Sequence, residues 1–244
     1  KTNISSRSCF KLKLLIMNNI INIGIPSKGR LKKDVLKIFK KKKLNLISER
    51  GERDLIGSIK SKTNIKIFYL HAREIIERLG DNSLDIGFSG FDLFKESEIN
   101  IQKKINVNKK LSFGKADLVV AIPDPWIDVQ TIADLEEIAF EFRDKKKKRL
   151  RVATKYPNLT KEFLFSKGVT QFRLVESLGA TEAYPFTGSA ELITDISSTG
   201  ETLKANNLRV LKDGEILKSQ ACIFTSKKNS KKKGLKKLIQ LLSK

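Results

Sequence analysis

The sequence predicts an α/β protein built from two lobes. Short apolar runs of strand length alternate with amphipathic segments of helix length, and the alternation begins again at the apolar run Ala116–Pro123. The 244 residues are 40% hydrophobic, which is enough to fill the cores of one large or two small domains. No apolar run reaches the length of about eighteen residues that a membrane span needs, so no transmembrane segment is predicted.

The first lobe is expected to contain three strands and two helices in alternation. The strands are predicted at Ile20 to Ile25, Ile65 to Leu70 and Leu84 to Phe88, and the helices at Leu31 to Lys42 and Ala72 to Gly80.

The second lobe is expected to follow the same pattern. After Ala116–Pro123, the prediction gives a helix at Thr131 to Arg143, a strand at Leu150 to Thr154, a helix at Thr160 to Lys167 and a strand-like run at Phe172 to Val175. Two further strand-like runs, Arg209 to Leu211 and Gln220 to Thr225, precede a lysine-rich amphipathic helix. Its apolar face is formed by Leu235, Leu238, Ile239 and Leu242.

Residues 1–16 carry four cations, several serines and no acid, a composition that superficially matches an organelle transit peptide. Met17 is the only methionine and stands directly before a strand-like segment. We therefore favour the interpretation that residues 1–16 are an extension outside the fold, translated from a misassigned start. The transit-peptide interpretation stays open.

The formal net charge of +22 raises the hypothesis of nucleic-acid binding, because clustered lysines bind phosphate backbones. The lysines concentrate in Lys40–Lys43, Lys145–Arg149 and Lys227–Lys237, with little aromatic interleaving. We interpret these runs as solvated surface and expect no specific nucleic-acid partner. The composition gives no physical reason for so high a charge.

The cysteine and histidine content narrows the chemistry. Cys9 and Cys222 allow at most one disulfide, and no paired Cys/His spacing indicates zinc, which fits a reducing cytoplasm. His71 is the only histidine, so a His-centred triad has almost nothing to build on. We interpret His71 as a surface or packing residue.

The segment from Asp195 to Leu203 is the strongest candidate site. Ala190 to Ile196 reads as a strand, Ser197 to Gly200 as a polar turn and Glu201 onward as a helix, an order that builds anion sites. Gly200 allows close backbone approach, and hydroxyl donors come from Ser197, Ser198, Thr199 and Thr202. An ordinary helix N-cap would explain the same composition.

The run Asp195 to Leu208 closely resembles the signature of ATP phosphoribosyltransferases for phosphoribosyl pyrophosphate (PRPP). Five other segments resemble that family in the expected order, from about Ile20 to Thr225. They are Pro26–Leu31, Asp85–Leu93, Leu111–Pro123, Arg151–Thr160 and Glu176–Glu182. Pro125-Trp126 and Phe142-Arg143 look most like the short form found in alphaproteobacteria, which implies the first enzyme of histidine biosynthesis.

The resemblance implies attack by an adenine ring nitrogen of ATP on the anomeric carbon of PRPP, with release of pyrophosphate and inversion. Mg²⁺ bound to the pyrophosphate is the implied cofactor, with unknown protein ligands. The loop Ser197–Thr202 is implied to hold the 5-phosphate and Asp195 the ribose hydroxyls, while Glu182 matches an acidic position that binds ribose or metal. Glu191 is left out, because it would lie roughly 13 Å from Asp195 along a strand. No residue stands out as a general base.

Other residues are candidates for ATP or pyrophosphate. Lys28, Gly29 and Arg30 lie in a loop after the first strand, and Gly90 and Asp92 follow the strand Leu84 to Phe88. Arg53 lies in a stretch that departs from the family pattern. Lys115 lies near the start of the second lobe, and Thr154, Lys155 and Tyr156 follow the strand Leu150 to Thr154 there. Surface charge is an alternative for Arg53, and a helix N-cap for Asp92.

The resemblance also implies a two-lobed, type II periplasmic-binding-protein-like fold with the substrate cleft between the lobes. Lobe I would take residues 17–109 and 205–244, and lobe II residues 110–204 with the PRPP loop. The expected partners are ATP, PRPP and a histidyl-tRNA-synthetase-like regulatory subunit, in a hetero-oligomer that contains catalytic dimers. A non-catalytic module of the same fold that binds an anionic metabolite is the alternative function.

Overall fold

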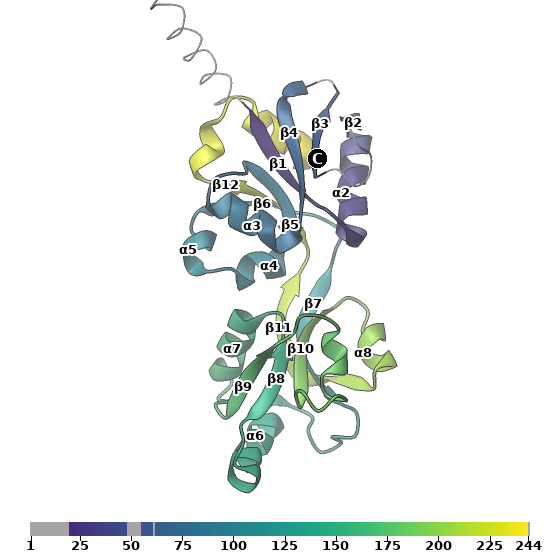
Figure 1. Cartoon of the computed structure of the whole chain (residues 1–244), viewed down its shortest axis with the longest axis vertical. Helices are drawn as coiled ribbons and strands as arrows, with labels where there is room; N and C mark the ends of the chain where they lie inside the picture. The colour runs from purple at the N-terminus through teal and green to yellow at the C-terminus, as the bar shows by residue number, and fades with distance from the viewer. Residues whose placement is uncertain (1–19, 48–54, 61, 244) are drawn as a thin grey trace, which may run out of the picture. The chain divides into compact units, whose positions relative to one another are not determined.

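The computed structural model describes residues 20–47, 55–60 and 62–243, which form two compact α/β units (Figure 1). The first unit takes the described residues up to Gly114 and those from Gln220 onward, and the second takes Lys115–Ser219. Each unit has one mixed sheet. The predicted α/β class is therefore confirmed. The extension at residues 1–16 lies outside the described residues.

The sheet of the first unit has the strand order β2-β3-β4-β1-β5-β12-β6. Strand β1 pairs in parallel with β4 and β5, so the carboxyl ends of these three strands share one edge. The strands are β1 (Ile21–Pro26), β2 (Leu46–Ile47), β3 (Ile56–Ile59), β4 (Lys62–Leu70), β5 (Ile86–Gly90), β6 (Ile105–Lys110) and β12 (Ala221–Ser226).

Helices cover both faces of this sheet. The helices are α2 (Gly29–Lys41), α3 (Ala72–Gly80), α4 (Phe91–Glu96), α5 (Ile99–Gln102) and α9 (Leu235–Ser243). Along β12, Ile223 joins the apolar core that contains the buried residues of α2 and α9, whereas Cys222 and Phe224 join the core of α3 and α4. This alternation follows from the period of two along a strand. Figure 1 shows α3 and α4 beside β5.

The predicted elements of the first unit are confirmed with shifts of a few residues at their ends, and α3 has the predicted bounds. Ile75, Ile76 and Leu79 lie buried on one face of α3, which is the spacing that predicted it. His71 precedes this helix, is exposed, and accepts a weak hydrogen bond at Nδ1 from Arg73 N at 3.4 Å. The surface interpretation of His71 is confirmed.

The sheet of the second unit has the order β11-β7-β10-β8-β9. Strands β8, β9 and β10 run parallel, and β7 runs antiparallel to β10 and β11. The elements are β7 (Ala116–Pro123), α6 (Ile132–Lys146), β8 (Leu150–Thr154), α7 (Pro157–Ser166), β9 (Phe172–Glu176), β10 (Leu192–Ser197), α8 (Glu201–Ala205) and β11 (Leu208–Ser219).

The expected boundary after residue 204 is wrong. Strand β11 pairs with β7 from Leu208↔Pro123 to Ser219↔Ala116, so it belongs to the sheet of the second unit. The sequence pattern showed only the short run Arg209–Leu211, because β-bulges interrupt the alternation between Val210 and Leu217. The boundary follows Ser219 instead.

In the described part of the chain, no helix is long and apolar enough to cross a membrane.

Candidate functional site

The turn after β10 leads through a glycine of positive φ into the short helix α8. Gly200 has φ +76°, in the left-handed region, and a Cβ built there would meet nothing within 4 Å. Backbone conformation, rather than lack of space, is therefore what favours glycine at this position. The segment Ser197–Thr202, which we call the hydroxyl loop, ends in α8.

Part of the hydroxyl loop is engaged in closing the turn. Ser197 Oγ accepts a hydrogen bond from Gly200 N at 3.1 Å, and Thr199 Oγ1 accepts a longer one from Glu201 N at 3.4 Å. The side chains of Ser198, Thr199 and Thr202 are exposed. The capping alternative thus accounts for two hydroxyls and leaves the outer face of the loop available to a ligand.

Asp195 lies half-buried at the end of β10, among three polar neighbours. Its Oδ1 accepts a hydrogen bond from Ile196 N at 2.8 Å, and the Thr181 hydroxyl lies close enough to the carboxylate to lower its pKa. Burial raises the pKa of Asp195, while the positive charge of Lys155 opposes this rise and the negative charge of Glu182 adds to it. Lys155 and Glu182 therefore lie within electrostatic reach of Asp195.

Buried threonines fix the strand ends beneath this site. Thr194 Oγ1 bonds to both Thr154 Oγ1 and Thr160 Oγ1 at 2.6 Å, which ties β10 to β8 and to α7. Tyr156 N donates to Thr154 Oγ1 at 2.9 Å. Thr154 and Tyr156 are themselves buried. The geometry thus favours a positioning role for the predicted residues Thr154 and Tyr156. Lys155, which lies between them in the chain, is partly exposed.

Parallel pairing brings these candidates to one edge of the second sheet. Thr194 lies opposite Thr154, and Thr154 opposite Glu176, so the residues that follow β8, β9 and β10 share an edge. Because β7 is antiparallel to β10, its Asp117 lies opposite Ser197 and the exposed Lys115 precedes it at the same edge. Ligands of open α/β sheets commonly bind outside the carboxyl ends of the parallel strands.

A second group of candidates lies at the corresponding edge of the first sheet. Lys28, Gly29 and Arg30 follow β1 and are exposed, and Gly29 has φ +82°. After β5, a Cβ on Gly90 would lie only 2.2 Å from Asp92 Oδ1, so glycine is what lets this carboxylate fold back over the strand end. Gly90 rather than Asp92 is the N-cap of α4.

The structure tests other sequence candidates less directly. Arg53 lies outside the described residues. Thr160, Thr181 and Thr194 were not predicted, and only their pattern as buried hydroxyls at strand and helix ends would have indicated them.

The described part of the chain holds no group of three or more His, Cys, Asp or Glu side chains arranged to bind a metal. Burial raises the pKa of the Cys222 thiol to about 11, which keeps it protonated near neutrality.

Comparison with solved structures defines the fold. A substrate-binding protein of an amino acid ABC transporter superposes with a TM-score of 0.52 at 14% identity, covering 92% of this chain and 90% of that one. A chain of the ATP phosphoribosyl transferase (HisG:HisZ) complex from Thermotoga maritima superposes with a TM-score of 0.71 at 25% identity, covering 91% and 96%. The fold is thus the type II periplasmic-binding-protein-like fold that was predicted.

Sequence comparison defines the family. The family model described as HisG, ATP phosphoribosyltransferase, matches residues 71–244. An ATP phosphoribosyltransferase of Rhizobium etli is 44% identical over 86% of this chain and 91% of its own length, and one of Brucella melitensis is 42% identical over 86% and 91%. One of Nitrobacter winogradskyi is 46% identical over 86% of this chain, but the match spans only 65% of that relative.

The family model and the curated relatives together define an enzyme of the pentosyltransferase class. Within that class, the chain belongs to the ATP phosphoribosyltransferase family, which catalyses the first step of histidine biosynthesis. The predicted family, fold and enzyme class are confirmed.

Proposed function

We propose that this chain transfers the 5-phosphoribosyl group of PRPP to an adenine ring nitrogen of ATP, releasing pyrophosphate and giving phosphoribosyl-ATP. The observation that carries the proposal is the placement of Asp195 and the hydroxyl loop together at the carboxyl edge of β10, inside the segment that the family model matches. We expect the reaction to take place in the cytoplasm.

The hydroxyl loop is proposed to hold the 5-phosphate. Among the described residues, no acceptor is found for the backbone N–H groups of Ser198, Thr199 and Thr202. Unpaired N–H groups of this kind bind phosphate oxygens, and the exposed hydroxyls of the same residues add donors. Gly200 keeps the turn free of a side chain where the phosphate approaches.

Asp195 is proposed to accept hydrogen bonds from the ribose hydroxyls, which fixes the face of the anomeric carbon that is open to attack. Lys155 lies close enough to lower the pKa of Asp195 and would also oppose the negative charge of the substrate. Glu182 is proposed to bind ribose or the metal. Thr154 and Tyr156 would hold Lys155 in position through the buried hydroxyl contacts of β8.

The chemistry then depends mainly on charge. As pyrophosphate leaves, the ribose gains oxocarbenium character and the leaving oxygens gain negative charge, which cations and aimed N–H groups stabilise. We assign Lys28, Arg30 and Lys115 to the phosphate chains of the substrates, with Gly29 and Gly90 leaving the backbone accessible. The attacking ring nitrogen is neutral and carries a lone pair, so the mechanism needs no general base.

Mg²⁺ is the proposed cofactor, and on the pyrophosphate it would supply positive charge to the leaving group. Carboxylate oxygens are ligands that Mg²⁺ prefers, and Asp92 and Glu182 each offer such a carboxylate. Asp92 is also proposed to contact ATP directly.

A regulatory subunit is the proposed protein partner. The Thermotoga maritima structure contains a HisG:HisZ complex, which supports a hetero-oligomer for this chain too. We propose that this chain forms catalytic dimers that assemble with a histidyl-tRNA-synthetase-like subunit.

The decisive assay measures pyrophosphate release from PRPP with ATP and Mg²⁺, with and without the regulatory subunit. We expect release that requires both substrates. No release in either condition, from folded protein that binds PRPP, would contradict the enzyme proposal and favour the alternative of a non-catalytic binding module of the same fold.

A further inference from the structure

A basic pocket lies in the second unit at the edge of the sheet away from the hydroxyl loop. It has a volume of about 530 Å³ and is lined by five cations, one aromatic ring and one carboxylate. The cations come from the end of α6 (Lys146), the following turn (Lys148 and Arg149), β8 (Arg151) and β9 (Arg173). Arg151 lies three residues before Thr154, roughly 10 Å along the strand from the proposed PRPP edge.

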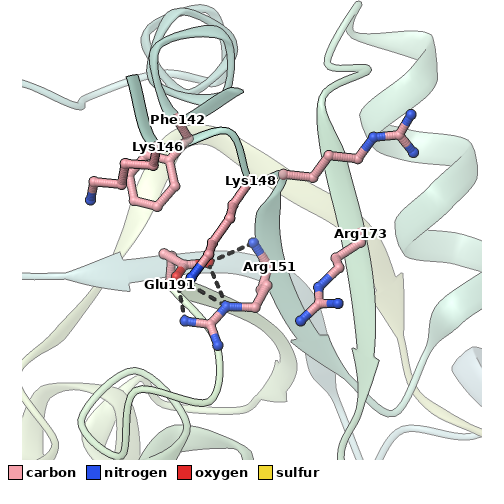
Figure 2. Close-up of a pocket in the computed structure, with 7 residues that line it drawn as sticks. Phe142, Lys146, Lys148, Arg151, Arg173 and Glu191 are labelled. Atoms are coloured by element: carbon pink, nitrogen blue, oxygen red, sulfur yellow. Dashed lines mark hydrogen bonds and ion pairs between the residues drawn. The ribbon is translucent and has the colours of Figure 1, made fainter. Parts of the chain in front are cut away.

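The only carboxylate that lines the pocket is fully engaged by one of the cations. Glu191 Oε1 accepts a hydrogen bond from Arg151 Nη2 at 2.6 Å, and Glu191 Oε2 accepts one from Arg151 N at 2.6 Å (Figure 2). The pair is partly buried, with side-chain exposures of 28% for Arg151 and 15% for Glu191. Glu191 therefore compensates Arg151 and leaves the charges of the other four cations in place.

Two arginines are held side by side by the sheet itself. Arg151 and Arg173 are register partners on the parallel strands β8 and β9, at a strand spacing of about 4.8 Å. Like charges in this arrangement destabilise a sheet. Arg173 has no ion pair with any described residue, and neither do Lys148 and Arg149. Figure 2 shows Lys148 directed toward the Arg151–Glu191 pair, with Arg173 beside Arg151.

We propose that this pocket binds a small ligand with two or more phosphate groups, at a site separate from the hydroxyl loop. The volume lies in the usual range of small-molecule sites, about 300–1,000 Å³. Guanidinium groups match phosphate oxygens in pairs, and lysine adds a flexible point charge. The cations that line this hollow come from four segments of the chain: the end of α6, the following turn, β8 and β9.

The pocket favours the phosphates over an attached base. Phe142 is the only aromatic residue that lines it, and the ammonium of Lys146 lies 3.8 Å from the centroid of that ring. Because the Lys146 ammonium covers the Phe142 ring, the pocket offers no aromatic face on which a base could stack. Proteins that bind single-stranded nucleic acid use such stacking. The ligand is thus recognised as an inorganic or organic oligophosphate. Free pyrophosphate and a nucleoside polyphosphate are its two possible sources.

The test measures binding of inorganic tripolyphosphate to the full chain by calorimetry. The double variant Lys148→Gln/Arg173→Gln removes two pocket charges, and Lys236→Gln/Lys237→Gln removes two exposed charges of α9 as the matched control. We expect the pocket variant to weaken tripolyphosphate binding at least about tenfold, since charge-assisted bonds to phosphate are lost, and the control to change it less than about twofold. PRPP affinity should stay unchanged in both.

A local signal identifies the binding site. Trp126 is the only tryptophan and its ring lies 6.4 Å from that of Phe142, so its fluorescence reports on the pocket. The signal should respond to tripolyphosphate in the control variant and not in the pocket variant, and Lys148→Arg/Arg173→Lys should restore binding. ATP is titrated in parallel, and an affinity equal to that of tripolyphosphate, which has the same number of phosphates, would assign recognition to the phosphates alone.

Two outcomes would overturn the proposal. One is equal tripolyphosphate affinity in the pocket and control variants, which would place all binding elsewhere. The other is tighter pocket-dependent binding of a single-stranded oligonucleotide or an acidic peptide than of tripolyphosphate, which would make the surface a macromolecular interface. Because PRPP binding is measured in the same variants, failure here is distinguishable from failure of the proposed enzyme activity.

Discussion

Substitution of Asp195 by alanine is expected to weaken PRPP binding far more than ATP binding. An ionised carboxylate offers about four acceptor positions, and the structure occupies one of them through Ile196 N, with the Thr181 hydroxyl close by. At least two positions remain for the two ribose hydroxyls. Hydrogen bonds to charged groups contribute about 1.5–3 kcal/mol each, so the loss amounts to about 3–6 kcal/mol, or between about 10² and 10⁴ in Kd.

The assay is calorimetric titration of the Asp195→Ala variant with PRPP and Mg²⁺, and separately with ATP. Glu162→Ala is the matched control, because Glu162 is an exposed carboxylate on α7 of the same unit. We expect the control to leave both affinities within about twofold, as for most surface substitutions. A PRPP loss below about threefold, or equal losses for PRPP and ATP, would refute the assignment of Asp195 to the ribose.

Three further predictions concern stability and pH. Lys232→Ala removes the ammonium that lies 2.8 Å from the buried Asp85 Oδ2, and should lower the free energy of unfolding, measured in urea, by about 3 kcal/mol. The control Lys233→Ala, at an exposed lysine, should lower it by less than about 0.5 kcal/mol. Equal losses in the two variants would show that the ion pair contributes nothing to stability. Because burial raises the pKa of Asp195, PRPP affinity should fall as pH decreases through that raised value, and Asp195→Asn should remove this dependence. Between the ordinary and the raised pKa, the folded state binds more protons at Asp195 than the unfolded state does. The free energy of unfolding should therefore fall as pH rises through this window. Urea unfolding at several pH values measures this dependence on pH.

The elements that the sequence predicted well are those with a complete local signal. Helix α3 has its apolar residues on one face and an extended residue before it, and β7 contains the continuous apolar run Leu118–Pro123, so neither needs a distant partner to be recognised. Strand β11 was missed as a unit because bulges break its alternation and because only pairing with β7 keeps it extended to Ser219. That pairing also determines where the second unit ends.

For the candidate site, the sequence identified the residues but left their roles ambiguous. The hydroxyl loop reads equally as a helix cap, and the structure shows Ser197 and Thr199 closing the turn while Ser198 and Thr202 stay exposed. The neighbours of Asp195 were only partly foreseen. Thr181 is brought to its carboxylate by the fold, and no local pattern marks that contact.

The sequence by itself determined the family, the α/β class and the hydroxyl loop, because these depend on local residue order and on segments that resemble known relatives. Only the tertiary structure showed that part of one basic run, Lys146, Lys148 and Arg149, lines a pocket. Arg151, Arg173 and Glu191 are far apart in the chain, and parallel pairing of β8 with β9 and β10 brings them together beside the end of α6. Strand register is a long-range property. The run Lys145–Arg149, which the sequence alone indicated as solvated surface, therefore lines part of a pocket in the fold.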